Sequence, residues 1–466
     1  MPACRKTLAN FYCAGPARIR SENTSYARIF KVLCASLRRS CQVTEQVGMS
    51  RLQYRVIALC IAINLLDGFD ILAMAYTAPA IGEAWQLSPE RLGILFSLGL
   101  AGMMAGSILL APLADRFGRR PTILGSLAIA AFSMLAASQS TNLLQLGAAR
   151  VATGLAIGAI LPCINTMVAE YAAPTSRAFA VSLMQAGFAV GASAGGFLAV
   201  CLLAQFGWQS VFLAGSALTF ILVPMVWFGM PESLAFLARK PERSEDHAAL
   251  IARVGEVGDG ARAQRAELDT GDAGWWRSQA EHRLPLILIS GAFFVSLMAF
   301  YFLTSWVPKL LVDGGLAQGE AVTAGALLTS GGIIAAFGLG WLSLRRSIIP
   351  IVASVTALSA AFMLLFGQLP SEVAWVLPAA FLLGLATNAT QIGLYAIVPS
   401  LFPAQIRAGA TGIAIGIGRT GSVVGPWLAG TLLGTGWSAA GLFAVMAVPY
   451  LVGVFILLGL RDWQRH

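Results

Sequence analysis

The sequence carries very little charge. Asp, Glu, Lys and Arg together make up 11% of its 466 residues, whereas an ordinary soluble domain is about a quarter charged. Hydrophobic residues make up 57% of the chain, more than one soluble core needs and enough for about a dozen membrane spans of ~20 residues each. The composition argues against a soluble globular enzyme and indicates an all-α, polytopic membrane protein.

Histidine is scarce and cysteine is unpatterned. The three histidines, His247, His282 and His466, all lie in a predicted loop or tail, and no Ser/His/Asp set accompanies them. Seven cysteines show no paired spacing for a metal or a disulfide, at Cys4, Cys13, Cys34, Cys41, Cys60, Cys163 and Cys201. We therefore expect no enzyme activity, no cofactor and no metal site.

A basic nucleic-acid-binding surface is also missing. The net charge is +9, but the basic residues lie in short connectors rather than on a soluble face, so we expect no nucleic-acid partner. The chain also lacks a soluble output domain, which a sensor or receptor would need. The expected surroundings are a lipid bilayer and small molecules, and we expect a monomer.

Apolar runs of a length that spans a bilayer occur in two groups of six. The first group covers residues 56–80, 92–114, 121–138, 144–169, 178–204 and 209–230, and the second covers 284–307, 322–344, 348–367, 373–400, 408–434 and 439–460. The polar stretch 231–283 is too charged to enter lipid and separates the groups. The sequence thus predicts two six-helix bundles, 51–230 and 284–460, a central loop over 231–283 and a tail over 461–466.

The distribution of positive charge predicts the orientation of these helices. With an even number of spans, both termini lie on one side, and 27 of the 31 Lys and Arg residues fall in segments assigned to that side. Cytoplasmic loops carry the excess of Lys and Arg. We expect both termini and the central loop to be cytoplasmic, in an inner (cytoplasmic) membrane.

The first 50 residues form a separate tail. This segment is rich in Arg and Ser and poor in acids, like a transit peptide, but it has no clear amphipathic run. We expect either that Met49 is the natural start or that residues 1–48 are disordered.

The two halves resemble each other at an offset of about 230 residues. Arg177 corresponds to Arg407, and Gly191 in the fifth span corresponds to Gly421 in the eleventh. Gly195 and Gly425 show the same offset. A parallel repeat of six spans is expected of a carrier in which two bundles rock around a central site.

Two acids in the middle of the first span are the residues with the largest free-energy cost of membrane insertion. A carboxylate at mid-membrane costs about 2.5–3.5 kcal/mol on insertion scales. Asp67 and Asp70 are spaced i, i+3, so both lie on one helical face. Desolvation and mutual repulsion favour protonation of such a pair, which predicts a proton carrier. A structural pair that caps or bridges to another helix is the alternative.

Two arginines also lie within predicted spans. A guanidinium stays charged and presents a planar fork that fits a carboxylate, so Arg419 is a candidate anchor for an anionic substrate, or a partner for Asp67 or Asp70. Arg150 is a second binding candidate or a stabiliser of its bundle. Polar and aromatic side chains that could line a pocket for a ring are Tyr301, Trp306, Gln185, Phe188, Asn388, Gln391 and Tyr395.

Further charges mark the cytoplasmic ends of the spans. Glu170 and Arg177 follow the fourth span, and Arg407 is the repeat partner of Arg177. We expect them either to form ion pairs between the bundles that open and close with transport, or to be solvated loop charges.

The connector between spans two and three carries the sequence Leu113-Ala114-Asp115-Arg116-Phe117-Gly118-Arg119-Arg120. This resembles the signature loop of the major facilitator superfamily. The resemblance implies a twelve-helix carrier fold in which Asp115, Arg116, Gly118, Arg119 and Arg120 serve in gating and Asp115 helps hold the outward-open state. The family glycine four residues before the Asp is Ala111 here, and the second-half copy has Leu344 in place of the Asp.

Several motifs narrow the resemblance to the aromatic acid:proton symporter family. They are Asp67-Gly68-Phe69-Asp70, the signature loop, Glu170-Tyr171 with Arg177, the run from Tyr301 to Pro308, and Gly418-Arg419-Thr420-Gly421-Ser422. The resemblance implies that Asp67 and Asp70 are needed for transport and that a benzoate-type or hydroxybenzoate-type anion is imported with protons. The alternatives are a carrier of the same superfamily for another organic anion or a sugar-like solute, and a proton-driven drug efflux antiporter.

Overall fold

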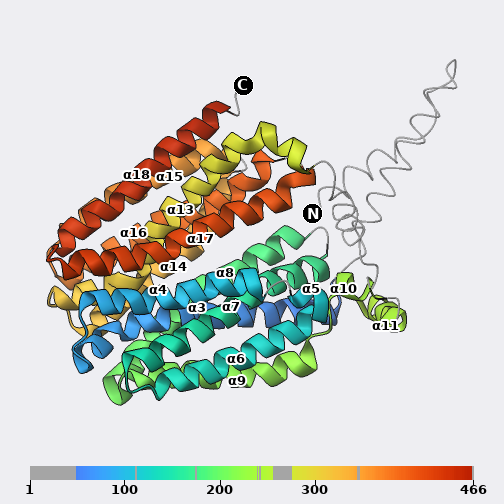
Figure 1. Cartoon of the computed structure of the whole chain (residues 1–466), viewed down its shortest axis with the longest axis horizontal. Coiled ribbons are helices and arrows are strands. Elements are labelled where there is room, and N and C mark those ends of the chain that lie inside the picture. Colours follow the sequence, from blue (N-terminus) through green and yellow to red (C-terminus); the bar gives the residue numbers. More distant parts are fainter. Residues whose placement is uncertain are drawn as a thin grey trace, which may run out of the picture. The chain divides into compact units, whose positions relative to one another are not determined.

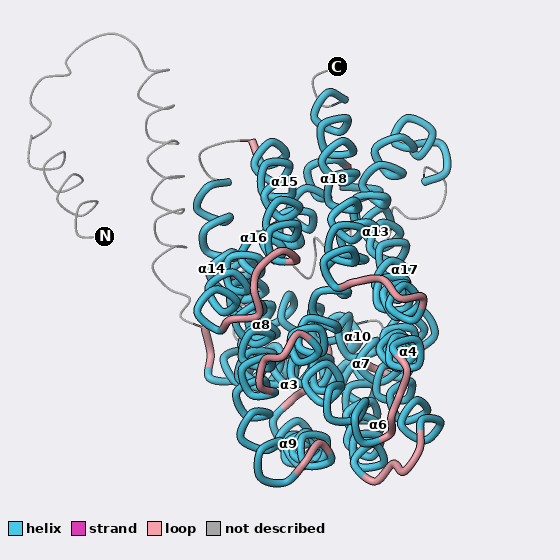
Figure 2. The backbone as a smooth tube through the Cα atoms, turned by 90° about the vertical axis from the view of Figure 1, so that its left-hand side faces the viewer, coloured by secondary structure: helices cyan, strands magenta, loops and turns pink. Residues whose placement is uncertain are grey.

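The computed structural model describes residues 49–110, 113–173, 176–238, 240, 243–254, 275–343, 347–402 and 404–463. These residues are helical apart from turns and short connections, and they contain no strand. The helices run side by side (Figures 1 and 2). Their bounds are α3 Arg51–Ala84, α4 Pro89–Leu109, α5 Leu113–Phe117, α6 Arg119–Ser138, α7 Leu143–Tyr171, α8 Arg177–Phe206, α9 Gln209–Gly229, α10 Leu234–Ala238, α11 Ser244–Val254, α13 Trp275–Asp313, α14 Gln318–Ser343, α15 Ile348–Phe366, α16 Val373–Leu401, α17 Ala404–Gly434 and α18 Ala439–Trp463.

Helix ends differ from the ends of the apolar runs because hydrogen bonding, not hydropathy, terminates a helix. α3 begins at Arg51, five residues before the predicted span. Ser50 caps it, since the Ser50 side chain accepts from the Gln53 N–H and the Gln53 side chain accepts from the Ser50 N–H. The second span, predicted to reach residue 114, ends at Leu109 because the signature loop folds into the short α5. Gly118, at φ +109°, then turns the chain into α6.

Eleven of the helices in the described residues are long and apolar enough to cross a membrane. The one predicted span missing from these eleven, residues 408–434, corresponds to α17, which is 31 residues long but contains eight glycines and Arg419. These residues lower its hydropathy without shortening it. α17 nevertheless packs along α13 and α4 among the other long helices (Figure 1). The structure therefore agrees with the expected all-α, twelve-helix architecture.

The segment predicted as a loop is partly helical. It contains α10 and α11, and α13 already begins at Trp275 rather than at residue 284. α11 is amphipathic, and Leu250 on its apolar side is buried in the hydrophobic cluster that includes Val56 of α3. A charged sequence can form such a helix when one face has an apolar surface to cover.

Glycines bring equivalent helix pairs into close contact in the two halves. A Cβ added at Gly191 of α8 would lie 1.8 Å from the Leu65 carbonyl oxygen of α3, and one at Gly421 of α17 would lie 2.2 Å from the Phe294 carbonyl oxygen of α13. Small residues permit backbones to approach this closely in membrane helix packing. The same crossing at an offset near 230 supports the internal repeat.

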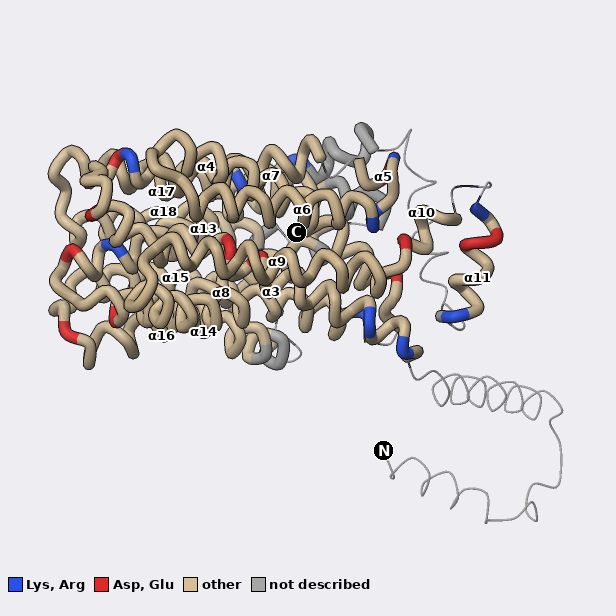
Figure 3. The backbone as a smooth tube through the Cα atoms, turned by 90° about the horizontal axis from the view of Figure 1, so that it is seen from below, with Lys and Arg blue, Asp and Glu red and all other residues tan. Residues whose placement is uncertain are grey.

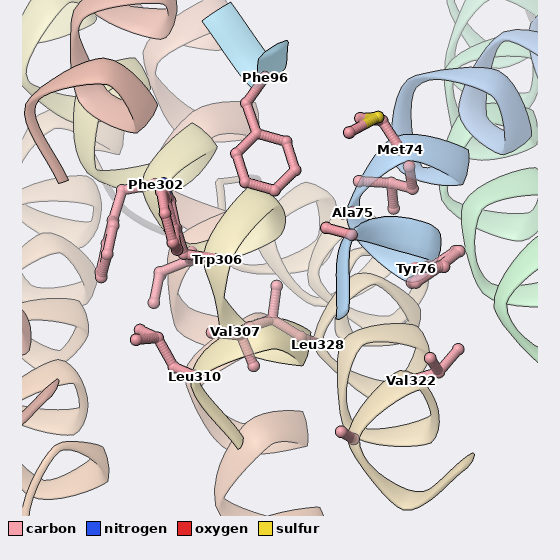
Figure 4. Packing of buried hydrophobic residues seen from close by; sticks show 14 of the residues in the cluster. Met74, Ala75, Tyr76, Phe96, Phe302, Trp306, Val307, Leu310, Val322 and Leu328 are labelled. Atoms are coloured by element: carbon pink, nitrogen blue, oxygen red, sulfur yellow. The ribbon is translucent and has the colours of Figure 1, made fainter. Parts of the chain in front are cut away.

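The halves contact each other nearer to the end that carries the turns 85–88, 314–317 and 435–438, here called the turn end. The Ser97 hydroxyl donates to the Val423 carbonyl at 2.8 Å, and the Ser193 and Thr329 hydroxyls lie 3.0 Å apart. Figure 4 shows Phe96 of α4 near Trp306 of α13, whose rings meet edge to face at 5.3 Å. We call the other end, which carries α5 and residues 171–173, the signature end.

Candidate functional site: charges between the helix halves

Most charged residues of the described chain lie at the ends of the helices, and a few lie along their middle (Figure 3). The four within the long apolar segments are Asp67, Asp70, Arg150 and Arg419. Ile63, Leu66, Asp67 and Asp70 lie on one face of α3, as the i, i+3 spacing predicts, because all four border the same cavity. Asp67 and Asp70 are each only 5% exposed.

Asp70 forms a buried ion pair with Arg150 of α7. The Arg150 Nη1 donates to Asp70 Oδ1 at 3.0 Å, and Nη2 donates to the Asp70 backbone carbonyl at 3.1 Å. The guanidinium also lies 5.9 Å from the centre of the Phe212 ring, within cation–π range. Of the two expectations for Arg150, this geometry favours the one in which it stabilises its own half.

Asp67 is buried but unpaired. Neither of its carboxyl oxygens has a hydrogen-bond partner among the described residues, and the Oδ2 of Asp70 also has none. A charged carboxylate buried in this way carries a large desolvation cost, which protonation removes. The pair of acids predicted from sequence therefore splits into one paired and one unpaired group.

Arg419 of α17 has no ion pair and no side-chain hydrogen bond in the part of the chain that the structure describes. It is half-buried, and its charge acts on Asp67, Tyr301 and Tyr395. The prediction that Arg419 pairs directly with Asp67 or Asp70 is not met in this structure, because Asp70 bonds to Arg150 and Asp67 is left free. Arg419 keeps its hydrogen-bond donors available for an anion.

Two small cavities flank the Asp70–Arg150 pair. The first, here called the central cavity, lies between α3, α4, α7 and α13 and is bordered by Phe96, Arg150, Tyr301, Thr304 and Ser305. The second, here called the first-half cavity, lies between α3, α6, α7 and α9 and is bordered by both aspartates. Ile157 borders both. The ion pair thus separates a cavity shared with the second half from one enclosed within the first.

The remaining predicted pocket residues are dispersed. Trp306 is 1% exposed, and its indole N–H donates to the Pro426 carbonyl at 3.0 Å. Tyr301 borders the central cavity, and Tyr395 is 42% exposed with its ring against Phe293. On α8, Gln185 is exposed and Phe188 is half-buried, and on α16, Asn388 is half-buried and Gln391 is buried.

The amides of α16 have partners within the second half. Asn388 donates to the carbonyls of Gly384 at 2.8 Å and Leu328 at 3.2 Å, and Gln391 donates to the Ser296 hydroxyl at 2.9 Å. The Gln391 Oε1 remains without a partner among the described residues. These contacts tie α16 to α13 and α14, and substrate contact by either amide stays a prediction.

Several residues predicted to act in gating lie at the signature end of the first half. Glu170 forms an ion pair with Arg119 and accepts from the Ser233 hydroxyl at 2.7 Å. Arg120 donates to the Trp227 carbonyl. In this structure Glu170 therefore pairs within its own half. It does not form the ion pair between the halves that was one of our two expectations. It is also 6% exposed and so not a solvated loop charge.

Among the described residues, Asp115, Arg116 and Arg177 form no ion pair across the halves. Asp115 and Arg116 on α5 are exposed, and Arg116 lies 5.5 Å from the Phe117 ring. Arg177 is partly buried, with its Nε unpartnered among the described residues. Arg407 belongs to α17, but its side chain lies outside the described residues.

Three residues of the site have little signal in the sequence. Glu232 accepts from the backbone N–H groups of Arg119 at 2.8 Å and Arg120 at 3.1 Å, and so caps the first turn of α6. Asn64, one turn before Asp67, donates to the Met184 carbonyl at 2.6 Å. Ser305 borders the central cavity. Asn64 could have been flagged as a buried polar group beside two acids, and Ser305 lies in the run from Tyr301 to Pro308 that resembles the symporter family.

Comparison with known proteins identifies the class to which this arrangement belongs. The sequence profile of the Major Facilitator Superfamily matches residues 58–386. The chain is 32% identical to the gallate transporter of Pseudomonas putida, over 87% of this chain and 91% of the relative. It is also 32% identical to the 4-hydroxybenzoate transporter PcaK of the same organism, over 87% and 92% of the two chains.

Among solved structures, the inward-open xylose transporter XylE from E. coli superimposes with a TM-score of 0.70 at 17% identity, covering 86% of this chain and 95% of that one. The chain belongs to the Major Facilitator Superfamily. It is a multi-span membrane transporter related to carriers of aromatic acids, and not an enzyme, as the composition and the signature loop predicted.

Proposed function

We propose that this protein takes up an aromatic carboxylate, such as benzoate or a hydroxybenzoate, together with protons. The observation that carries the proposal is the pair of unpartnered charges at mid-membrane, Asp67 on α3 and the half-buried Arg419 on α17. One can take a proton and the other a carboxylate. The names of the gallate and 4-hydroxybenzoate transporters support an aromatic acid as the substrate class.

The ring of the substrate would lie beside apolar and hydroxylated side chains. Phe96, Tyr301, Thr304 and Ser305 border the central cavity, and aromatic walls with a few polar groups suit a small aromatic ligand. Tyr395 lies within the electrostatic reach of Arg419. Arg419 also acts on Tyr301, which borders the central cavity, so we infer that the ring of a carboxylate bound to Arg419 lies against α13.

In this proposal, proton and substrate transport are coupled because the loaded carrier has no net buried charge. Protonation of the Asp67/Asp70 site and binding of a carboxylate at Arg419 together neutralise the buried charges, which lowers the barrier to movement of the halves. With both termini on the cytoplasmic side of an inner membrane, the turn end faces outward. The contacts of Ser97 with Val423 and of Ser193 with Thr329 then close the outer side, and the structure corresponds to an inward-facing state.

The test is uptake of labelled 4-hydroxybenzoate and benzoate into proteoliposomes under an imposed inward proton gradient, with and without a protonophore. Accumulation that the protonophore abolishes is the expected result. No accumulation of either anion, in vesicles that contain correctly inserted protein, would contradict the proposal.

Two variants separate the roles of the charges. Asp67→Asn should lose accumulation driven by the proton gradient while it retains exchange of labelled for unlabelled substrate at equal pH. Arg419→Ala should lower both accumulation and exchange at substrate concentrations near the wild-type Kd, because the anion binds more weakly. If Asp67→Asn still accumulates substrate uphill under the pH gradient, Asp67 does not carry the coupled proton.

A further inference from the structure

The first-half cavity lies apart from the central cavity. Its walls come from four helices of one half, with Asp67 and Asp70 from α3, Leu127 and Ala130 from α6, Ile160 from α7 and Thr219 from α9. The Asp70–Arg150 ion pair stands between this cavity and the central one. A molecule in the first-half cavity would therefore meet the two acids from the side away from the central cavity.

Asp67 and Asp70 border this cavity, and three of their carboxyl oxygens have no hydrogen-bond partner among the described residues, namely both oxygens of Asp67 and Oδ2 of Asp70. A dry, unpartnered polar group in a protein interior costs about 1–3 kcal/mol, and more when it is charged. The cavity offers about 30 Å³ of space to water. One water needs about 10–15 Å³ by the same measure and two or more polar partners, so there is room for one or two.

Thr219 supplies a further polar partner. Its hydroxyl hydrogen is used on its own helix, since Oγ1 donates to the Gly215 carbonyl at 2.7 Å. The oxygen lone pairs remain available to accept a hydrogen bond from water. The walls from α6 and α7 are apolar, as Leu127, Met134 and Ile160 show, so the two acids are the only charged residues that border the cavity among the described residues.

We propose that the first-half cavity is a hydration site whose water carries the coupled proton between Asp67 and Asp70. The water accepts the proton of the Asp67 carboxyl group and donates one of its own protons to Asp70 Oδ2. The O–H bond at Asp67 breaks, one forms at Asp70, and the water is regenerated. This relay rests on the proposed proton-coupled function and adds the path that the proton takes.

The charged and titratable groups that face Asp67 in the described structure are few. Asp70 lies on the same helix, Arg150 pairs with Asp70 from α7, and Arg419 and Tyr301 act on Asp67 from the second half. None of these groups other than Asp70 borders the first-half cavity. Water is therefore the group through which Asp67 can exchange a proton with its neighbour.

Infrared difference spectroscopy tests the hydration site without reference to any substrate. Purified protein in lipid is titrated with acid in H₂¹⁶O and in H₂¹⁸O, and the water O–H bands and the carboxyl C=O bands are compared. We expect a water band that shifts with ¹⁸O and that Asp67→Asn alters. Ala130→Val, which fills the cavity from α6, should abolish it, whereas the exposed control Ala136→Val on the same helix should retain it.

Thr219→Val keeps the size of the side chain, so it tests the site even if Ala130→Val disturbs folding. It should shift the water band, and Thr219→Ser, which keeps the hydroxyl, should not. A water band that is absent, or that is unchanged in Thr219→Val and in folded Ala130→Val, would overturn the proposal.

Transport measurements then test the relay. Ala130→Val should lower accumulation under a proton gradient to the level of wild type with protonophore, yet keep substrate exchange at equal pH, because Arg419 and the central cavity are untouched. Ala136→Val should keep both activities. Gradient-driven accumulation at the wild-type level in Ala130→Val would refute the relay. If wild type itself accumulates no aromatic acid, the proposed function fails, and the infrared result still decides whether the cavity holds water.

Discussion

The two halves of the transporter have the same close helix–helix contacts but differ in their charged residues. Gly154 of α7 meets the Gly99 carbonyl of α4, and Gly384 of α16 meets the Leu328 carbonyl of α14 in the same way. These pairs, like Gly191 and Gly421, are related by an offset of 229 or 230 residues. Backbone packing has therefore been kept in both copies.

The charges do not follow the repeat. At this offset Asp67 corresponds to Ser296, Asp70 to Ala299 and Arg150 to Ala380, while Arg419 corresponds to Ala189. The first half holds a buried ion pair and a free acid, and the second half holds a free arginine. The difference fits our proposal that the first half binds the proton and the second half binds the anion.

The ion pair should be the most sensitive part of the first half. Asp70→Asn leaves the Arg150 charge buried without its carboxylate, and breaking a buried pair in this way costs about 3–5 kcal/mol. We expect a marked fall in thermal unfolding temperature in detergent. Asp67→Asn makes the same chemical change three residues away but breaks no pair, so it is the matched control and should unfold near the wild-type temperature. Equal losses in both variants would contradict the division into paired and unpaired acids.

The free arginine should matter for binding more than for stability. Hydrogen bonds to charged groups contribute about 1.5–3 kcal/mol, so Arg419→Ala should weaken binding of 4-hydroxybenzoate by about 10- to 150-fold. Scintillation proximity binding at fixed pH measures this change. Arg419→Lys keeps the charge but not the planar fork, so its affinity should lie between those of wild type and Arg419→Ala. Wild-type affinity in Arg419→Ala would place the anion elsewhere.

The shared crossings predict equal effects in the two halves. An alanine methyl at Gly191 or at Gly421 would overlap a carbonyl oxygen of the facing helix, and such overpacking costs about 1–3 kcal/mol. Both variants should lower the unfolding temperature by similar amounts. Gly412→Ala in α17, where a Cβ would meet no atom within 4 Å, should leave it unchanged. A large effect in one half alone would break the structural repeat.

The smallest effect is expected at a partly exposed pair. Lys309 and Asp313 form an i, i+4 ion pair at the turn end of α13, and the Asp313 side chain is 53% exposed. Surface pairs contribute about 0.2–1 kcal/mol. Lys309→Ala should therefore shift the unfolding temperature little, and the shift should shrink further in high salt. A loss as large as that of Asp70→Asn would show that burial is not what separates the two pairs.

Much of the fold could be predicted from sequence because membrane insertion depends on local hydropathy. The apolar runs marked the long helices, and the offset near 230 related the halves. The limits of the helices were less accurate. Capping by Ser50 lengthened α3, Gly118 set the start of α6, and the amphipathic α11 lay in a segment predicted as a loop. Each depends on hydrogen bonds or contacts that hydropathy does not report.

The candidate site was predictable in its residues but not in its pairing. Asp67 and Asp70 stood out because acids at mid-membrane are costly, and Arg150 and Arg419 stood out for the same reason. Which arginine pairs with which acid depends on the packing of α3 against α7. Asp70 and Arg150, which pair across these helices, are 80 positions apart in the sequence. The contact that Glu232 makes could not be predicted either, because it caps α6 only when the chain folds back on the signature loop.

The sequence by itself determined that this chain crosses the membrane many times, that its halves are copies, and that four charges lie within the apolar segments, since each follows from residue type and spacing. Only the tertiary structure decided that Asp70 is neutralised by Arg150, that Asp67 and Arg419 are left unpaired, and that a cavity lies behind the aspartates. Ion pairs and cavities form between helices, and the close crossings at glycines that bring those helices together are contacts between residues far apart in the chain.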